Sequence, residues 1–394
     1  MQKNQKKKIP LNRTKDGKHV DVFLIFSAIV IVLILSVGSL ILPDVKMSEN
    51  ENRYLTQAPD LNLDDVLEGE YESKLEEYLS DQIIGREKWI KIMSRVSKDL
   101  GATDVNGVYI LKDGRLIERK TESEFLIDRY KNNLDAVSEF EKEVSEGGTE
   151  VKVLLVPSAA YSYREEFNSS TNFDEKSAMN IAKETLGDTY IDFSDALMPD
   201  KDHPKGYYYL TDHHWNYSGA EKGAETYREN LGLDKRTYTP ETLTEDFKGT
   251  LYSKVLLSER VRDSIEIPRE TLDLKLRVTV EGEEYDSIYF MDRLENKDKY
   301  EVFLGGNYDR VDIVNEEEGA LRKPSLLIVK DSYANSFVPF ILDDFSHITM
   351  VDTRYYRDSV KDLALDEEYD QVLILYSITN FSEEKLDLNS SMLQ

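Results

Sequence analysis

The sequence of 394 residues contains no cysteine, only two tryptophans and only five histidines. The lack of cysteine excludes disulfides, cysteine-ligated zinc sites, iron–sulfur clusters and thiol nucleophiles. Basic residues are also scarce, because 50 Lys and Arg stand against 77 Asp and Glu and give a formal net charge of −27. A surface this acidic repels phosphate backbones, which argues against a nucleic-acid partner. Apolar residues nevertheless make up 40 % of the chain, enough to bury a sizeable core.

One long hydrophobic run lies near the N-terminus, at residues 22–42, and it contains neither a charge nor a proline. As a helix it would rise about 31 Å, which matches the roughly 30 Å hydrocarbon core of a bilayer. The leader before it, residues 1–21, is rich in lysine. The positive-inside rule keeps such a leader in the cytoplasm and sends the rest of the chain across the membrane. We therefore predict a single-pass cell-membrane protein with its large domain outside the cytoplasm.

Two other interpretations of this run remain open. A cleaved signal peptide usually has a shorter apolar stretch and a cleavage site of small residues, neither of which is evident here. A buried helix of a soluble protein is rarely apolar on every face beside a cluster of lysines. These differences favour a transmembrane anchor that stays attached to the chain.

Beyond the anchor, the composition separates a connecting segment from a large domain. Residues 43–69 contain prolines and many Asp and Asn residues, which is typical of an irregular stalk. From residue 70 onward, apolar residues recur at helical spacing. We therefore expect one large domain over residues 70–394.

Four short runs in this domain are almost continuously apolar: 151–156, 325–329, 348–351 and 371–376. Strands that are apolar on both faces are typical of a parallel sheet covered by helices on both sides. The pattern therefore predicts an α/β domain with a doubly wound sheet. Residues 262–317 interrupt it with alternating runs, which we interpret as a β-rich insertion on the sheet.

The small number of histidines narrows the search for a catalytic base. Three of them are weaker candidates for a base. His19 lies in the leader, His203 in a polar turn and His347 directly before an apolar strand. His213 and His214 remain, in a polar, loop-like segment directly after Asp212. In an extended segment, residues two apart point the same way, so Asp212 could orient His214 as an acid–base group while His213 faces away.

Two further interpretations of the histidine pair are open. Adjacent histidines after an aspartate could ligate a metal, although neighbouring side chains usually diverge and no third histidine supports them. Both could instead be structural, although such a polar segment is an uncommon place for buried histidines. The acid–base interpretation is favoured, and we expect no metal.

A base of this kind needs a nucleophile, and Ser332 is the best-placed serine. It follows the 325–329 run, at the end of a predicted parallel strand where open α/β sheets place their sites. A helix from about Asn335 would direct its N-terminal amides toward an anion formed there. Ser332 could also be an ordinary helix cap. Ser158, which follows the 151–156 run, is a weaker rival.

Two segments carry a resemblance to a known family: residues 211–216 (TDHHWN) and 330–333 (KDSY). Together they resemble the DHHW family, a branch of the SGNH/GDSL hydrolase-like superfamily that is similar to the alginate O-acetyltransferase proteins. The resemblance extends to residues 51–55, 81–86 and 351–356. It implies a three-layer α/β fold with a Ser-His-Asp triad in which Asp and His precede Ser.

Carried over position by position, the resemblance implies that Ser332 is the nucleophile, His214 the base and Asp212 its orienter. Acyl transfer also needs hydrogen-bond donors for the oxyanion that forms. Three groups are candidates for this oxyanion role: the backbone N–H of Ser332 and the side chains of Asn380 and Asn307. Three neighbours are expected to form a wall of the site: Trp215, Tyr333 and Lys330, the last of which stands where the superfamily usually has glycine.

The sequence therefore favours a membrane-anchored, extracytoplasmic O-acetyltransferase or acetylesterase that acts on an exopolysaccharide or cell-wall glycan without a cofactor. The resemblance further implies a membrane-bound O-acyltransferase partner that supplies acetyl groups. A non-catalytic polysaccharide-binding or scaffold subunit is the alternative, because the 24 Tyr and 14 Phe could stack on sugar rings. A metal-dependent hydrolase built on His213 and His214 is a third interpretation.

Overall fold

The computed structural model describes residues 15–48, 53–167, 172–203, 206–257, 261–383 and 385–393. Most of the expected leader therefore lies outside the described residues. The chain divides into two compact units, Met1–Ile90 and Lys91–Gln394. The proposed start of the large domain at residue 70 falls inside the first unit and stays a prediction.

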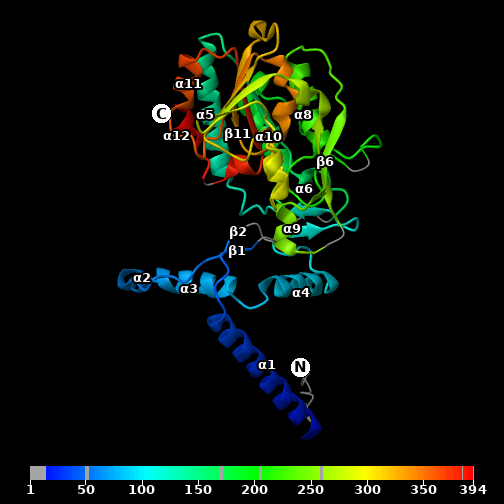
Figure 1. Cartoon of the computed structure of the whole chain (residues 1–394), viewed down its shortest axis with the longest axis vertical. Coiled ribbons are helices and arrows are strands. Elements are labelled where there is room, and N and C mark those ends of the chain that lie inside the picture. Colours follow the sequence, from blue (N-terminus) through cyan, green and yellow to red (C-terminus); the bar gives the residue numbers. More distant parts are fainter. Residues whose placement is uncertain are drawn as a thin grey trace, which may run out of the picture. The chain divides into compact units, whose positions relative to one another are not determined.

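The apolar run forms a single long helix, α1 (Lys15–Ile41) (Figure 1). Its segment Val22–Ser39 is long and apolar enough to cross a membrane, and none of that segment is buried inside the structure. By length and composition, the helix fits either an anchor or a signal sequence.

Short elements follow α1 in the first unit. Strands β1 (Met47–Ser48) and β2 (Arg53–Tyr54) pair antiparallel, and helices α2 (Leu63–Glu68), α3 (Glu70–Asp81) and α4 (Arg86–Asp99) come next. The segment expected to be an irregular stalk therefore contains a strand pair and a helix. Gly69 ends α2 and precedes α3 with a φ of 77°, a left-handed conformation that favours glycine.

Seven strands of the described ranges form the central sheet of the second unit, in the order β5-β13-β11-β12-β10-β8-β9. The first four are parallel: β5 (Glu150–Val156), β13 (Gln371–Ser377), β11 (Ser325–Lys330) and β12 (His347–Val351). They coincide with the four apolar runs of the sequence and are buried along most of their length. The predicted parallel sheet is confirmed for this part.

The other part of the sheet is antiparallel and comes from residues 262–317. Strands β10 (Arg310–Asn315), β8 (Leu276–Val280) and β9 (Glu283–Tyr285) extend the sheet beyond β12. Buried and more exposed residues alternate along β8 and β10, as is typical of a sheet with one covered face. These strands therefore lengthen the sheet at its edge, and the sheet is mixed.

Helices cover both faces of the sheet, so the predicted three-layer α/β fold is confirmed (Figure 1). One face is covered by α5 (Ile127–Ser145), α7 (Glu175–Leu186), α11 (Val360–Asp366) and α12 (Leu388–Leu393), and the other by α8 (Tyr217–Asn230) and α10 (Tyr333–Phe337). Alternate residues of β5 enter the two cores, with Leu154 in one and Leu155 in the other.

Smaller elements surround the carboxyl ends of the parallel strands. Strands β3 (Val108–Ile110) and β4 (Leu116–Glu118) form an antiparallel pair, and β6 (Pro240–Phe247) pairs antiparallel with β7 (Asp263–Pro268). Two short α-helices, α6 (Ala159–Ser162) and α9 (Thr250–Val255), also belong to this part, and short 3-10 helices occur in the connecting segments.

Candidate active site

The loop after β11 places Ser332 at the carboxyl ends of the parallel strands. Asp331 holds this loop, because its carboxylate accepts hydrogen bonds from the N–H groups of Tyr333 and Ser377, each at 2.9 Å. Ser377 ends β13, so the loop is joined to the neighbouring strand. Ser332 directly precedes α10, but its side chain makes no capping hydrogen bond. Its hydroxyl is therefore not used to begin the helix.

Two segments far apart in the sequence bring three side chains together at this point. Nδ1 of His214 lies 2.6 Å from Oδ1 of Asp212, and Nε2 of His214 lies 2.7 Å from Oγ of Ser332. All three residues are buried, with exposed fractions of 2 % for Asp212, 5 % for His214 and 9 % for Ser332. The arrangement can move a proton from the hydroxyl to the imidazole and stabilise the imidazolium that results.

The charge states of the carboxylate and imidazole suit this role. Burial would raise the pKa of Asp212, but the adjacent imidazoles and their hydrogen bonds outweigh burial and hold that pKa well below its usual value. Burial lowers the pKa of His214, and the charge of His213 lowers it further against the opposing effect of Asp212. At neutral pH the site therefore pairs an ionised carboxylate with a neutral imidazole. Asp212 accepts from Nδ1–H, which leaves Nε2 to accept from the hydroxyl.

The start of α9 holds Asp212 in place. The N–H and the hydroxyl of Thr250 donate to Oδ2 of Asp212 at 2.7 and 3.0 Å, and the N–H of His214 donates to Oδ1 at 3.0 Å. Gly249 approaches so closely that an added Cβ would stand 2.2 Å from Cβ and Oδ2 of Asp212. Sequence analysis did not identify Gly249 or Thr250, because neither forms part of a recognisable motif.

We expect Gly249→Ala to damage the site, because the new methyl group must displace Asp212 from His214. A displacement of about 1 Å corresponds to a loss of about 10²-fold in kcat, and the overpacking should cost about 1–3 kcal/mol of stability. Kinetics on a chromogenic acetyl ester and thermal unfolding measure the two effects. Gly147→Ala is the matched control, because its Cβ would approach no atom closer than 3.3 Å. Equal activity in both variants would contradict the role given to this close approach.

His213 does not face away from the site, so that expectation is wrong. Its ring centroid lies 3.9 Å from that of His214, and its Nδ1 lies 2.8 Å from the hydroxyl oxygen of Thr250. The chain bends through residues 211–214 instead of running extended, so the alternation of side chains does not apply. Asp212, His213 and His214 could hold a metal ion by proximity alone. An ion on Nδ1 of His214 would have to replace its hydrogen bond to Asp212.

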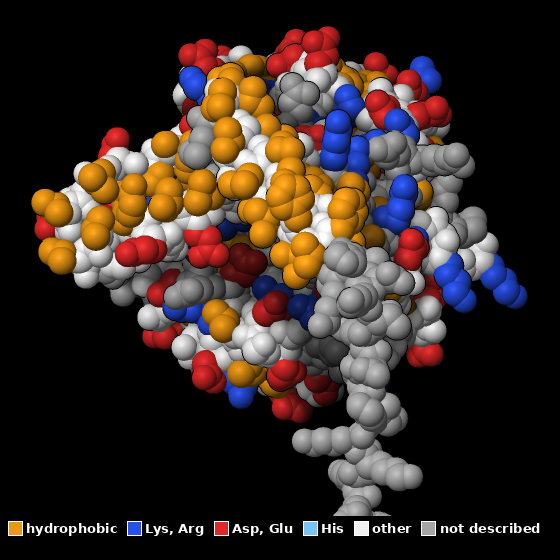
Figure 2. Space-filling view, turned by 90° about the horizontal axis from the view of Figure 1, so that it is seen from below, with side chains coloured by type: hydrophobic (Ala, Val, Ile, Leu, Met, Phe, Trp, Pro, Cys, Tyr) orange, Lys and Arg blue, Asp and Glu red, His pale blue; other side chains and the backbone are white. Residues whose placement is uncertain are grey.

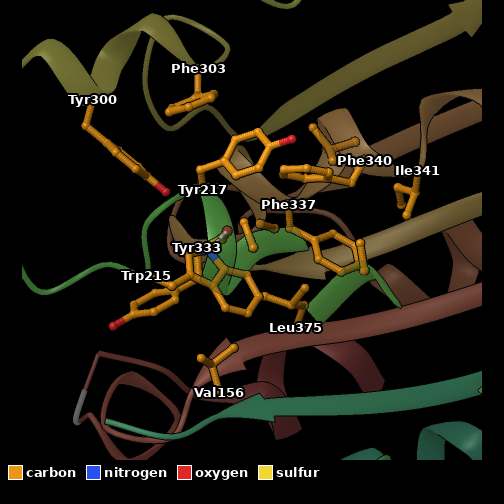
Figure 3. Close-up of a cluster of buried hydrophobic side chains, with 14 of the residues drawn as sticks. Val156, Trp215, Tyr217, Tyr300, Phe303, Tyr333, Phe337, Phe340, Ile341 and Leu375 are labelled. Atoms are coloured by element: carbon orange, nitrogen blue, oxygen red, sulfur yellow. Dashed lines mark hydrogen bonds between the residues drawn. The ribbon is translucent and has the colours of Figure 1, made fainter. Parts of the chain in front are cut away.

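Buried aromatic side chains pack against the triad, and Figure 3 shows the hydrophobic cluster to which they belong. The ring of Tyr300 stacks on that of His214, with centroids 4.0 Å apart and planes inclined by 10°, and its hydroxyl donates to the carbonyl oxygen of Ser332 at 3.0 Å. Trp215 is fully buried, and its Nε1–H donates to the carbonyl oxygen of Tyr333 at 3.1 Å. Sequence analysis missed Tyr300, which lies in the β-rich segment with no motif around it.

The residues expected to form a wall take different positions. Trp215 lies beneath the site and lines no exposed surface. Tyr333 borders a small pocket beside the triad. Lys330 is buried, and its Nζ donates to the side-chain oxygens of Asn307 and Asn335 at 3.0 and 2.8 Å. Burial lowers the pKa of Lys330 to about 8.

The expected oxyanion donors also differ from one another. Among the described residues, none accepts a hydrogen bond from the backbone N–H of Ser332, so this donor is available. The side-chain oxygen of Asn307 accepts a hydrogen bond from Nζ of Lys330, and this bond does not use the amide hydrogens of Asn307. Asn380 donates from Nδ2 to Asp331 at 2.8 Å, which commits one of its amide hydrogens to holding the loop.

The rival nucleophile and the remaining described histidines have other partners. The hydroxyl of Ser158 accepts from the N–H of Tyr161 and caps α6, and it also donates to Glu175 at 2.5 Å. Burial raises the pKa of Glu175 to about 7. His203 and His347 lie beside carboxylates of their own, at 3.0 Å from Asp200 and 3.3 Å from Asp312. Neither belongs to the triad.

Comparison with known proteins agrees with this fold. Residues 119–304 match the family model described as the SGNH hydrolase-like domain of acetyltransferase AlgX, a range that includes Asp212 and His214 and ends before Ser332. A DHHW family protein from Eubacterium siraeum is 25 % identical over 74 % of this chain and 97 % of its own, with a TM-score of 0.61. No curated protein sequence matches significantly.

PatB1 from Bacillus cereus, in a structure with a sulfonyl adduct, has the same fold. It is 19 % identical over 72 % of this chain and 99 % of its own, with a TM-score of 0.58. The second unit therefore has the α/β fold of these proteins, and its sequence is similar to the SGNH hydrolase-like domain of acetyltransferase AlgX. This similarity to DHHW and AlgX-type proteins agrees with the resemblance that the sequence motifs indicate.

Proposed function

We propose that this protein is an O-acetyltransferase or acetylesterase that acts on a polysaccharide or cell-wall glycan through Ser332, His214 and Asp212. The observation that carries this proposal is the unbroken hydrogen-bonded path from the carboxylate through the imidazole to the serine hydroxyl. The polysaccharide substrate rests on the resemblance to the alginate O-acetyltransferase proteins and on the match to the AlgX model.

In the first half-reaction, Oγ of Ser332 attacks the carbonyl carbon of an acetyl ester while Nε2 of His214 takes the hydroxyl proton. The oxyanion that forms is stabilised by the backbone N–H of Ser332, with Asn307 as the second candidate donor. The tetrahedral intermediate collapses, the imidazolium protonates the leaving alkoxide, and the acetyl group stays on Ser332.

In the second half-reaction, a hydroxyl of the acceptor takes the place of the departed alcohol. Nε2 of His214 removes its proton as the oxygen attacks the acetyl-serine, and the proton then returns to Oγ of Ser332. A glycan hydroxyl gives O-acetylation, whereas water gives hydrolysis. The same three side chains serve both outcomes, so access of the acceptor decides between transfer and hydrolysis.

We propose that α1 is retained as an anchor and holds the enzyme on the outer side of the cell membrane. Its apolar length supports this proposal, and so does the lysine-rich leader before it. A membrane-bound O-acyltransferase that delivers acetyl groups across the bilayer is the partner implied by the family resemblance. Such a partner would also explain why an exported acetyltransferase remains attached to the membrane.

Intact-mass measurement after incubation with an acetyl donor ester tests the proposed chemistry. We expect a gain of one acetyl group, mapped by peptide analysis to Ser332 and absent from a Ser332→Ala variant. A protein that binds glycan but never acquires acetyl would instead be the non-catalytic binding subunit. Acetyl mapped to Ser158 would contradict the assignment of the nucleophile.

The activity should respond to pH through His214, which must be neutral to act as a base. Because burial and the charge of His213 lower its pKa, the acid limb of kcat/KM should have its midpoint below the ordinary value of 6.5. Activity therefore rises as the pH increases through this midpoint and is complete at neutral pH. In His213→Gln the midpoint should move upward, because one cause of the lowered pKa is removed. A wild-type midpoint at or above 6.5 would contradict this expectation.

A further inference from the structure

Helix α4 carries its apolar face outward. Four apolar side chains of this face recur at helical spacing and are 40–61 % exposed: Trp89, Ile92, Met93 and Val96. Leu100, just after the helix, is 82 % exposed. Ser94, on the other side of the same helix, is fully buried. A surface helix of a soluble domain normally buries its apolar face and exposes its polar one. Figure 2 shows exposed hydrophobic side chains on the face that is seen from below.

The same helix is basic in an otherwise acidic protein. By helical spacing, Lys88 and Arg95 lie beside the apolar face, whereas Lys91 and Lys98 lie on the opposite side of the helix. The chain as a whole has a formal charge of −27. Basic residues next to a face of Trp and aliphatic side chains are typical of helices that lie in a membrane interface and bind anionic lipids.

Hydrogen bonds tie the start of α4 to the outer end of α1. The N–H of Ile84 donates to Oγ of Ser39 at 3.0 Å, and Nε1–H of Trp89 donates to the carbonyl oxygen of Ile84 at 3.0 Å. Ser39 ends the apolar segment of α1, two residues before the helix itself ends. If α1 spans the bilayer, these two hydrogen bonds hold Trp89 near the membrane surface, where tryptophan is enriched.

We propose that α4 lies in the outer interface of the membrane that α1 spans, with its apolar face among the lipid chains and the flanking Lys88 and Arg95 on anionic headgroups. This inference rests on the proposed anchoring by α1 and goes beyond the proposed chemistry. The continuity with α1 and the local positive charge favour a lipid surface over a protein partner. A second contact of this kind restricts how far the enzyme can move from the bilayer.

Spin labelling of the full chain tests this placement, and the lack of native cysteine makes single-site labels straightforward. Nitroxides at Met93→Cys, Lys98→Cys, Leu321→Cys and Ile31→Cys are compared in vesicles of phosphatidylcholine and phosphatidylglycerol. Oxygen, which partitions into lipid, and a water-soluble nickel chelate serve as collision reagents. Leu321 is the matched control, because it is an apolar residue that is 89 % exposed and lies elsewhere in the chain.

We expect the Met93 label to collide with oxygen in preference to nickel, and the Lys98 and Leu321 labels to show the reverse. The preference at Met93 should weaken in vesicles of phosphatidylcholine alone. A Met93 label as accessible to nickel as the Leu321 label would overturn the inference. Shielding of Met93 from both reagents would also overturn it, because a second copy of the chain would then cover the face. The Ile31 label separates the two proposals. If the Ile31 label collides mainly with the nickel chelate, α1 does not span the membrane and the anchor is rejected. If the Ile31 label collides mainly with oxygen and the Met93 label mainly with nickel, only the placement of α4 is rejected.

Discussion

Replacing Ser332 by alanine should lower kcat for cleavage of a chromogenic acetyl ester by about 10⁴-fold or more. The hydroxyl is the acyl acceptor of the proposed mechanism, and its hydrogen bond to His214 is its main polar interaction. The side chain does not cap α10, so its removal should leave the fold nearly unchanged. Activity and thermal unfolding measured on the same preparation separate loss of chemistry from loss of structure.

Ser158→Ala is the informative comparison, because Ser158 also follows a parallel strand and is the rival nucleophile. Its loss removes the cap of α6 and leaves the buried Glu175 without its closest partner, so stability should fall by about 1–3 kcal/mol. Its activity at a temperature where it stays folded should remain close to that of the wild type. Retained activity in Ser332→Ala, with loss of activity in folded Ser158→Ala, would reverse the assignment.

Asp212→Asn should lower kcat by about 10³- to 10⁴-fold. The substitution removes the charge that stabilises the imidazolium of His214 in the transition state. Each oxygen of Asp212 also faces a backbone N–H, that of His214 at 3.0 Å or that of Thr250 at 2.7 Å. An amide nitrogen in either place therefore meets a donor, and the carboxylate geometry cannot be kept. Steady-state kinetics with the same ester measure the loss.

A Thr250→Val variant is the control for this experiment. It removes one hydroxyl bond to Asp212 and leaves the carboxylate and its charge in place. Its loss of kcat should be much smaller than that of Asp212→Asn. Similar losses in the two variants would mean that the position of α9, and not the charge of Asp212, governs the site.

The central part of the fold was predictable because burial on both faces leaves a direct trace in the sequence. Each parallel strand appears as an uninterrupted apolar run, and these runs locate β5, β11, β12 and β13. The antiparallel strands were harder to place. Alternation along β8 and β10 indicates strands with one covered face, but it does not state which neighbour they pair with. Their addition to the sheet edge depends on long-range pairing with β12.

The site was predictable where chemistry restricts the residue type. The few histidines, an aspartate two positions before one of them, and a serine after a buried strand point to Asp212, His214 and Ser332. The supporting residues are set by tertiary contacts that have no local signature. Tyr300 reaches His214 from the antiparallel part of the chain, and Gly249 is required only because Asp212 passes close to its backbone.

The indole of Trp215 has a consequence for the proposed mechanism. Its N–H is shared between the carbonyl oxygen of Tyr333 and the hydroxyl of Ser336, while its own backbone directly follows His214. One ring thus joins the segment that carries His214 to the helix that follows Ser332, a task that secreted proteins often give to a disulfide. In the proposed mechanism, the distance for proton transfer is thus fixed before any substrate binds, so the binding energy of a glycan would be free to orient the incoming hydroxyl.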